Sequence, residues 1–112
     1  MEPFFEVSAD AEGQFSFKFF DKDGTLMMMG GLHDNQEAAE KTIQDVRVGS
    51  LMSNQVAASK TPDGDMFFVI KDSKGQIIAK SVLFQNQMVF NNALHAVKDA
   101  ACVAEIRLGQ AA

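Results

Sequence analysis

The sequence contains two similar halves. Shifted by 51 positions, the first half of the 112-residue chain aligns with the second without a gap. The matching residues are Ser8, Gly13, Phe17, Asp21, Gly24, Leu32, Asn35, Gln36 and Val46, which align with Ser59, Gly64, Phe68, Asp72, Gly75, Leu83, Asn86, Gln87 and Val97. Similarity at a fixed spacing is typical of supersecondary units that bury their apolar faces against one another. The sequence therefore predicts two copies of one small unit around a shared core.

Three strands followed by a helix are predicted in the first half. The strands are expected at residues 4–8, 15–19 and 25–29. In the second strand, phenylalanines at every other position from Phe15 to Phe19 alternate with polar residues, which is the period of a half-buried strand. Acidic residues followed by glycine separate the strands and are typical of turns.

A helix is expected after a break at Gly30 and Gly31. Asp34 or Asn35 is predicted to cap it through a side-chain oxygen, and Gly49 is predicted to end it. Its apolar face carries Ala39, Ile43 and Val46. These residues are spaced so that they share one side of a helix.

The second half repeats this plan. Its strands are expected at residues 55–59, 66–70 and 76–81. Asn86 is predicted to cap the second helix. The apolar face of that helix is expected to carry Val89 or Phe90, together with Ala93, Leu94 and Val97.

The predicted fold class is α+β. Tandem βββα repeats at residues 4–50 and 55–101 are expected to form one antiparallel sheet of about six strands. Both helices should pack on one face, with internal pseudo-two-fold symmetry. One unit alone would have too small a core, so residues 1–112 are expected to form a single domain. The tail at 103–108 fits a short edge strand and an alanine-rich helical continuation almost equally.

A set of glycine, phenylalanine and helix positions matches the pattern of a known family. The positions are Gly13, Phe15, Phe17, Gly24, Glu40, Ile43, Val46 and Arg47 in the first half, and Gly64, Phe68, Gly75, Asn92, Val97 and Lys98 in the second. With these residues the chain resembles the YegP-like family, small bacterial proteins of unknown function that occur in single-copy and duplicated versions. It is similar to the duplicated version.

This resemblance has departures and limits. Lys41 replaces a helix asparagine of the family pattern, and Phe67 and Val69 replace charged residues. The resemblance implies an α+β fold with internal pseudo-two-fold symmetry and a relation to single-copy homodimers. It implies no activity, because none is assigned to the family.

Charge and composition limit the classes of partner that we expect for this chain. Fifteen acidic residues against ten basic ones give a net charge of −5, which repels phosphate backbones, so we expect no nucleic-acid partner. No apolar run approaches the length of a bilayer span and the acidic start does not match a signal peptide, so we expect no membrane association. The single cysteine, Cys102, fits a reducing compartment, and a cytoplasmic location is predicted.

Residues that carry chemistry form no recognisable site in the sequence. Asp21 and Asp23 do not fit a calcium loop, because a phenylalanine and a glycine fall at its first and last ligand positions. His33 and His95 lack partners at the spacing of metal ligands. Cys102 has no base beside it. We therefore predict no metal, no cofactor and no enzymatic activity.

Apolar residues occur where strand side chains should face away from the helices. Residues out of phase with the predicted core include Phe20, Met27, Met29, Phe67, Val69 and Ile78. A solvated sheet face should be mostly polar, and an exposed apolar patch usually marks an interface. We take these residues as a candidate binding interface. An error of one residue in strand phase would exchange the two faces and remove the patch.

Two functions of different classes follow from these features. The first is a small bacterial module without enzymatic activity, which binds a protein partner, or a second copy as a homodimer, through the open sheet face. The alternative is binding of a small anionic ligand, or catalysis, at the joint between the repeats. There Asn92, His95 and the helix N-termini at Asn35 and Asn86 would converge. Internal duplication favours a monomer, whereas the apolar face favours a dimer.

Overall fold

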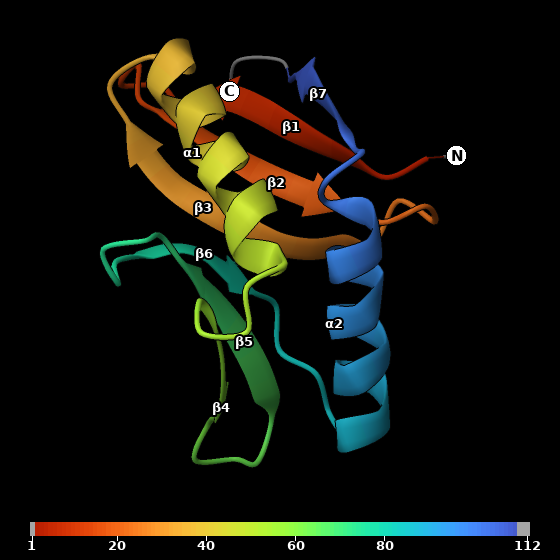
Figure 1. Ribbon diagram of the computed structural model, residues 1–112. Coiled ribbons are helices and arrows are strands. Elements are labelled where there is room, and N and C mark those ends of the chain that lie inside the picture. Colours follow the sequence, from red (N-terminus) through yellow and green to blue (C-terminus); the bar gives the residue numbers. More distant parts are fainter. Residues whose placement is uncertain (1, 110–112) are drawn as a thin grey trace.

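In residues 2–109, which the computed structural model describes, seven strands and two helices form (Figure 1). The elements are β1 (Phe4–Ala9), β2 (Phe15–Phe20), β3 (Leu26–His33), α1 (Gln36–Ser50), β4 (Val56–Lys60), β5 (Met66–Lys71), β6 (Ile77–Ser81), α2 (Gln87–Ala100) and β7 (Glu105–Leu108). The predicted α+β class is confirmed. Three strands and a helix follow one another twice, but a duplicated origin and a pseudo-two-fold axis stay predictions.

All the strands belong to one sheet, in the order β4-β5-β6-β3-β2-β1-β7 across the described residues. Neighbours from β4 to β1 are antiparallel. β7 instead runs parallel to β1, which corrects the expected antiparallel sheet of about six strands to a mixed one. The parallel pair is possible because α2 carries the chain back across the sheet before β7 begins (Figure 1). Of the two alternatives for the tail, the edge strand is therefore correct.

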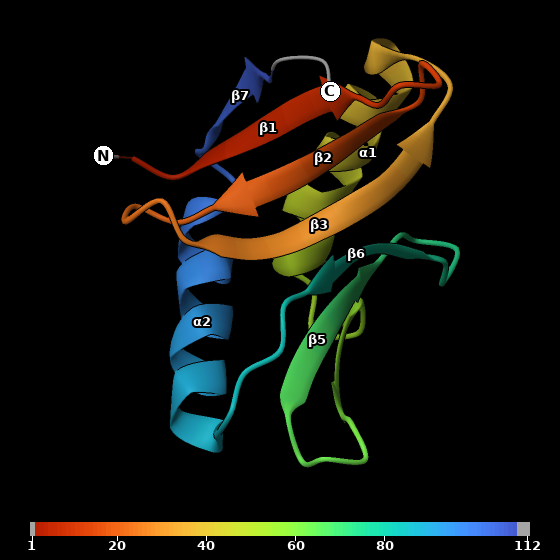
Figure 2. The ribbon, with the colours of Figure 1, turned by 180° about the vertical axis from the view of Figure 1, so that it is seen from behind.

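Both helices lie on the same side of the sheet, in front of it in Figure 1 and behind it in Figure 2. Between sheet and helices lies the core, whose largest buried side chains include Phe5, Phe17, Phe19, Phe68 and Met28. The helices contribute Ala39, Ile43 and Val46 from α1, and Phe90, Ala93 and Val97 from α2. Neither helix of the described chain has the length and apolar character needed to cross a bilayer.

An asparagine caps the start of each helix. The Oδ1 atoms of Asn35 and Asn86 accept hydrogen bonds from the backbone N–H three residues on, at 2.8 Å and 2.9 Å. These bonds satisfy backbone groups that the helix itself leaves free. Asn35 rather than Asp34 is the first cap, and α1 ends at Ser50, one residue after the predicted Gly49.

Aspartates close the hairpin turns between β2 and β3 and between β5 and β6. The carboxylate of Asp21 accepts hydrogen bonds from the backbone N–H groups two and four residues on, at 2.8 Å and 2.9 Å. Asp72 does the same at 2.9 Å and 3.0 Å. Gly24 and Gly75 complete the turns with positive φ angles of 79° and 85°. Both aspartates are thus used by the local backbone.

β3 does not end at the predicted glycine pair. The strand continues through Gly30 and Gly31 to His33. Packing requires the first glycine, because a Cβ at Gly30 would collide with the Phe17 ring and lie 2.7 Å from the Ile78 carbonyl oxygen. The strand is therefore not broken at the glycines, although its pairing with β2 is irregular there, because Phe17 is opposite Gly30 and Phe15 is opposite His33.

Arg47 of α1 forms hydrogen bonds with the segment that leads into β7. Its guanidinium donates hydrogen bonds to the carbonyl oxygens of Cys102 and Ala104, at 3.0 Å and 2.9 Å. The same group lies 5.6 Å from the ring centroid of Phe5 on β1. A single charged side chain therefore connects the first helix, the first strand and the segment before β7.

Gly30→Ala is expected to destabilise the fold by about 1–3 kcal/mol, the usual cost of forcing a methyl group into a packed core. Gly31→Ala is the matched control, because a Cβ at Gly31 would meet no atom within 4 Å. Urea denaturation followed by circular dichroism gives both free energies of unfolding. Equal values for the two variants would contradict the packing role of Gly30.

Arg47→Met should lower the free energy of unfolding by about 2–4 kcal/mol, because two carbonyl groups lose a charged donor. Amide hydrogen exchange measured by mass spectrometry should accelerate in β1 and β7. Lys41→Met changes an exposed residue of the same helix and should leave both exchange and stability nearly unchanged. Unaltered exchange in β7 of the Arg47 variant would show that this arginine does not hold the strand.

Candidate functional site

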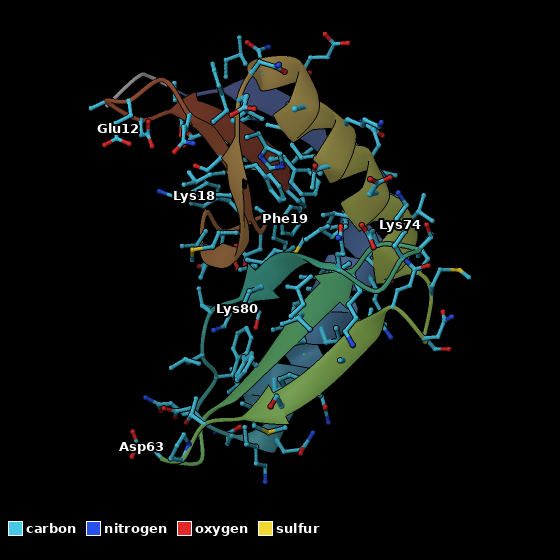
Figure 3. All side chains as sticks on the ribbon, turned by 90° about the vertical axis from the view of Figure 1, so that its left-hand side faces the viewer. Glu12, Lys18, Phe19, Asp63, Lys74 and Lys80 are labelled. Carbon is cyan, nitrogen blue, oxygen red and sulfur yellow. The ribbon has the colours of Figure 1, made fainter. Side chains whose placement is uncertain are left out.

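The outer face is defined here as the side of the sheet that faces away from α1 and α2. Figure 3 shows Lys18 and Lys80 projecting from this side, whereas Phe19 points toward α1. Side chains alternate along strands, and residues directly opposite on neighbouring strands share a face. The apolar and charged residues of the outer face are Phe4, Glu6, Lys18, Phe20, Leu26, Met29, Ala57, Phe67, Val69, Lys71, Ile77, Lys80, Glu105 and Arg107.

A β-bulge removes Met27 from the predicted interface. Phe19 is opposite Met28 and Phe20 is opposite Leu26, so Met27 is an extra residue in β3. A bulge turns consecutive side chains to one side of the sheet. Met27 is only 6% exposed and belongs to the core. The predicted outward position of Met27 was therefore wrong, and Leu26 lies on the outer face instead.

The corresponding bulge in β6 corrects the placement of Ile78. Ile70 is opposite Ala79 and Lys71 is opposite Ile77, which leaves Ile78 as the extra residue. Ile78 is half-buried and packs against the core. The two bulged residues are 51 positions apart, the same shift that aligns the halves of the sequence.

Phe20 lies on the outer face at the end near the N-terminus. Its ring stacks on Phe4 with 5.0 Å between ring centroids. The guanidinium of Arg107 in turn covers Phe4, 4.2 Å from the ring centroid. This stacking leaves Phe20 half-buried, so only part of its ring is free to contact a partner.

Phe67 and Val69 lie on the outer face of β5. The Nζ atom of Lys80 is 4.8 Å from the ring centroid of Phe67. Val69, which pairs with Ala57 and Lys80, is 9% exposed although it lies outside the main core cluster. The lysine stem thus covers part of the apolar surface while its ammonium group stays near solvent.

Met29 is 41% exposed and forms one wall of a groove on the outer face. The groove lies where the chain leaves the end of β6. Beyond this point the chain pairs with β5 again at an isolated bridge between Met66 and Phe84. Leu83, just before that bridge, is 53% exposed and forms another wall. Sequence reasoning missed Leu83 because it lies beyond the end of the strand, where no alternation places it on a face.

Basic side chains outnumber acidic ones among the outer-face residues. Four residues of this face are basic, namely Lys18, Lys71, Lys80 and Arg107, and two are acidic, namely Glu6 and Glu105. Arg107 and Glu105 form an ion pair with each other. Within the described part of the chain, no carboxylate lies within 4.0 Å of the three lysine ammonium groups. The face is therefore net basic in a chain whose net charge is −5.

The residues of the predicted joint site do not converge. The N-termini of α1 and α2, at Asn35 and Asn86, lie at opposite ends of the molecule (Figure 1). Both caps are engaged with their own helices. Asn92 and His95 are neighbours on α2, and His95 Nε2 lies 3.1 Å from a carboxylate oxygen of Asp99 on the exposed side of that helix. The expected convergence was therefore wrong.

The remaining reactive side chains hold structure together. His33 places Nδ1 3.3 Å from the Phe15 carbonyl oxygen and Nε2 2.9 Å from Thr42 Oγ1, which joins β3 to β2 and α1. The thiol of Cys102 lies 3.9 Å from the Arg47 carbonyl oxygen. Across residues 2–109, no three His, Cys, Asp or Glu side chains gather as a metal site.

Two sequence relatives align with most of this chain. The UPF0339 protein PA0329 of Pseudomonas aeruginosa is 25% identical over 96 residues, which cover 86% of this chain and 87% of that protein. The UPF0339 protein YegP of Escherichia coli K12 is 26% identical over 98 residues, which cover 88% of this chain and 89% of YegP. No family model matches the chain.

Two solution NMR structures have the same fold. UPF0339 protein SO3888 from Shewanella oneidensis superposes with a TM-score of 0.90 at 20% identity, covering 98% of this chain and 93% of that one. The E. coli protein yegP, described as of unknown function, superposes with a TM-score of 0.88 at 23% identity, covering 98% and 95%. These likenesses confirm the fold.

Two methionines in β3 provide a test of the outer-face assignment. Met27→Lys should destabilise the fold by about 3 kcal/mol or more, because it places a charge in the core. Met29→Lys should change the free energy of unfolding by less than about 0.5 kcal/mol, because its side chain reaches solvent. Urea denaturation of both variants measures the difference. The reverse order would show that the bulge is misplaced.

Proposed function

This chain is a homologue of the UPF0339, or YegP-like, proteins, a family of unknown function, and we propose that it is a non-enzymatic module that binds another protein through the outer face. The predicted resemblance to this family is confirmed, whereas the likeness to its duplicated version stays a proposal. The observation that carries the proposal is the groove, where exposed Met29 and Leu83 flank the half-buried ring of Phe67. Apolar walls with a charged rim are typical of protein-binding sites.

The proposed site keeps part of the interface that the sequence predicted. Phe20, Met29, Phe67 and Val69 lie on the outer face, and their role in binding stays a proposal. Met29 and Phe67 line the groove. Methionine suits such a site because its flexible side chain adapts to different partners.

A different protein is a better partner for this face than a second copy. A symmetric dimer with outer face against outer face would bring together two surfaces that are both net basic and both carry Lys18, Lys71 and Lys80. Like charges brought together in an interface oppose association. We therefore propose a monomer that binds another protein, and a homodimer is the competing outcome of the experiment below.

Engaged reactive groups support the absence of an enzymatic role. Both ring nitrogens of His33 lie near structural partners, and the Asp21 and Asp72 carboxylates are bonded to their own turns. A catalytic base or nucleophile needs a free lone pair directed at substrate. An anionic-ligand site at the joint is not supported, because the N-termini of α1 and α2 lie at opposite ends of the molecule.

The history and setting of the protein are also proposed. Duplication of one βββα unit, with pseudo-two-fold symmetry between the halves, is supported by bulges at Met27 and Ile78, which lie 51 positions apart. A cytoplasmic location is supported by the free thiol of Cys102. The net charge of −5 disfavours nucleic acid as a general partner.

Met29→Lys/Leu83→Lys is expected to abolish recovery of the specific partner when the purified protein is cross-linked in a bacterial lysate and captured. Leu51→Lys/Met88→Lys is the matched control, because it changes the same residue types at exposed positions away from the outer face, one just after α1 and one in α2. Quantitative mass spectrometry compares the captured proteins. Circular dichroism confirms that all variants are folded.

Light scattering after size exclusion completes this experiment. We expect one mass, that of a monomer, across an about hundredfold range of concentration for wild type and both variants. If the wild type is a dimer and only the Met29/Leu83 variant disrupts it, the outer face binds a second copy of this chain rather than a different protein. Identical captured proteins and identical masses for all three chains would reject the outer face as a binding site.

A further inference from the structure

We infer that the segment bound by the outer face is a short linear stretch of a partner protein that is acidic and carries apolar anchor side chains. This inference rests on the proposed function and specifies the chemistry of its partner. Two independent features of the same surface support it, the apolar lining of the groove and the unpaired basic groups around it.

The lining of the groove indicates apolar anchors. Its walls and floor come from Met29, Thr61, Phe67, Lys80, Val82 and Leu83. At the edge of the groove, the backbone N–H of Val82 donates a hydrogen bond to the Met27 carbonyl oxygen of β3, at 3.1 Å, and the next residue, Leu83, is exposed. A linear segment that inserts an aliphatic or aromatic side chain here would bury the exposed parts of Met29 and Leu83.

The charges around the groove indicate an acidic segment. Lys80 lines it, and Lys18 is directly opposite Met29 on the neighbouring strand. Neither ammonium group has a carboxylate of the described chain within 4.0 Å, although the chain has 15 acidic residues. Carboxylates of a partner would supply the missing opposite charges, which speeds encounter and selects the partner.

Single-stranded nucleic acid is the other anionic partner that a sheet with aromatic residues could bind. Such binding needs ring faces that are free for base stacking. Here Lys80 lies over Phe67, while Arg107 and Phe20 occupy the neighbourhood of Phe4. The exposed walls of the groove are the thioether and aliphatic side chains of Met29 and Leu83, and the one aromatic side chain in its lining is Phe67. These features favour apolar side chains of a peptide over bases.

A random library of 12-residue linear peptides displayed on phage tests the inference. The folded full-length protein is the target, and binders that also bind Met29→Lys/Leu83→Lys are discarded. We expect the remaining peptides to carry net negative charge and at least one large apolar residue. Their dissociation constants are then measured by fluorescence anisotropy with the synthetic peptides.

Charge reversal separates electrostatic recognition from general effects. Lys18→Glu/Lys80→Glu should raise the dissociation constants of these peptides by about tenfold or more, because two attractions become repulsions. Lys22→Glu/Lys74→Glu is the matched control, since it changes net charge equally at exposed turn positions. The control should weaken binding by less than about twofold, and added salt should weaken wild-type binding.

The possible results distinguish this inference from the proposed function. Groove-dependent peptides that are neutral or basic would overturn the acidic partner and leave protein binding by the outer face intact. A library without groove-dependent peptides would overturn the linear segment, and the capture experiment above would then decide whether the face binds protein at all. Binding of labelled dT20 that requires Lys18 and Lys80, without acidic peptides, would replace the inference with nucleic-acid binding.

Discussion

The antiparallel pairing of β3 with β6 is the contact on which the rest of the structure depends. It aligns Met28 with Ser81 and Met29 with Lys80. Through it, strands β1 to β3 and strands β4 to β6 become parts of one sheet, and both inner faces share one layer of helices. Three strands and one helix alone would enclose too small a core to be secure.

The same pairing produces the candidate site. It brings Met29 and Lys80 together on the outer face at the seam between the halves, beside the ring of Phe67. The groove forms next to this seam because the chain separates from β5 after β6 ends. The apolar groove lies on the same face as the lysines Lys18, Lys71 and Lys80. This combination of an apolar groove with basic neighbours makes the outer face the strongest candidate for an external partner.

Much of the fold could be predicted from the sequence because it depends on residues that are close along the chain. Hairpin turns require a glycine with positive φ, and helix starts require a short side-chain acceptor such as Asn86. Alternation also placed Phe20, Met29, Phe67 and Val69 on the outer face. Their proposed role in binding depends on exposure and on neighbours, which alternation does not give.

Tertiary structure decided the features that depend on contacts between distant segments. The bulges that turn Met27 and Ile78 inward are visible only when the partner strands are known, because an extra residue has no signature within its own strand. β3 passes Gly30 without a break because of its contact with Phe17. β7 is parallel to β1 because α2 returns the chain to that edge. The sequence by itself determined the local elements and their apolar faces, while only long-range pairing decided which side chains reach the surface.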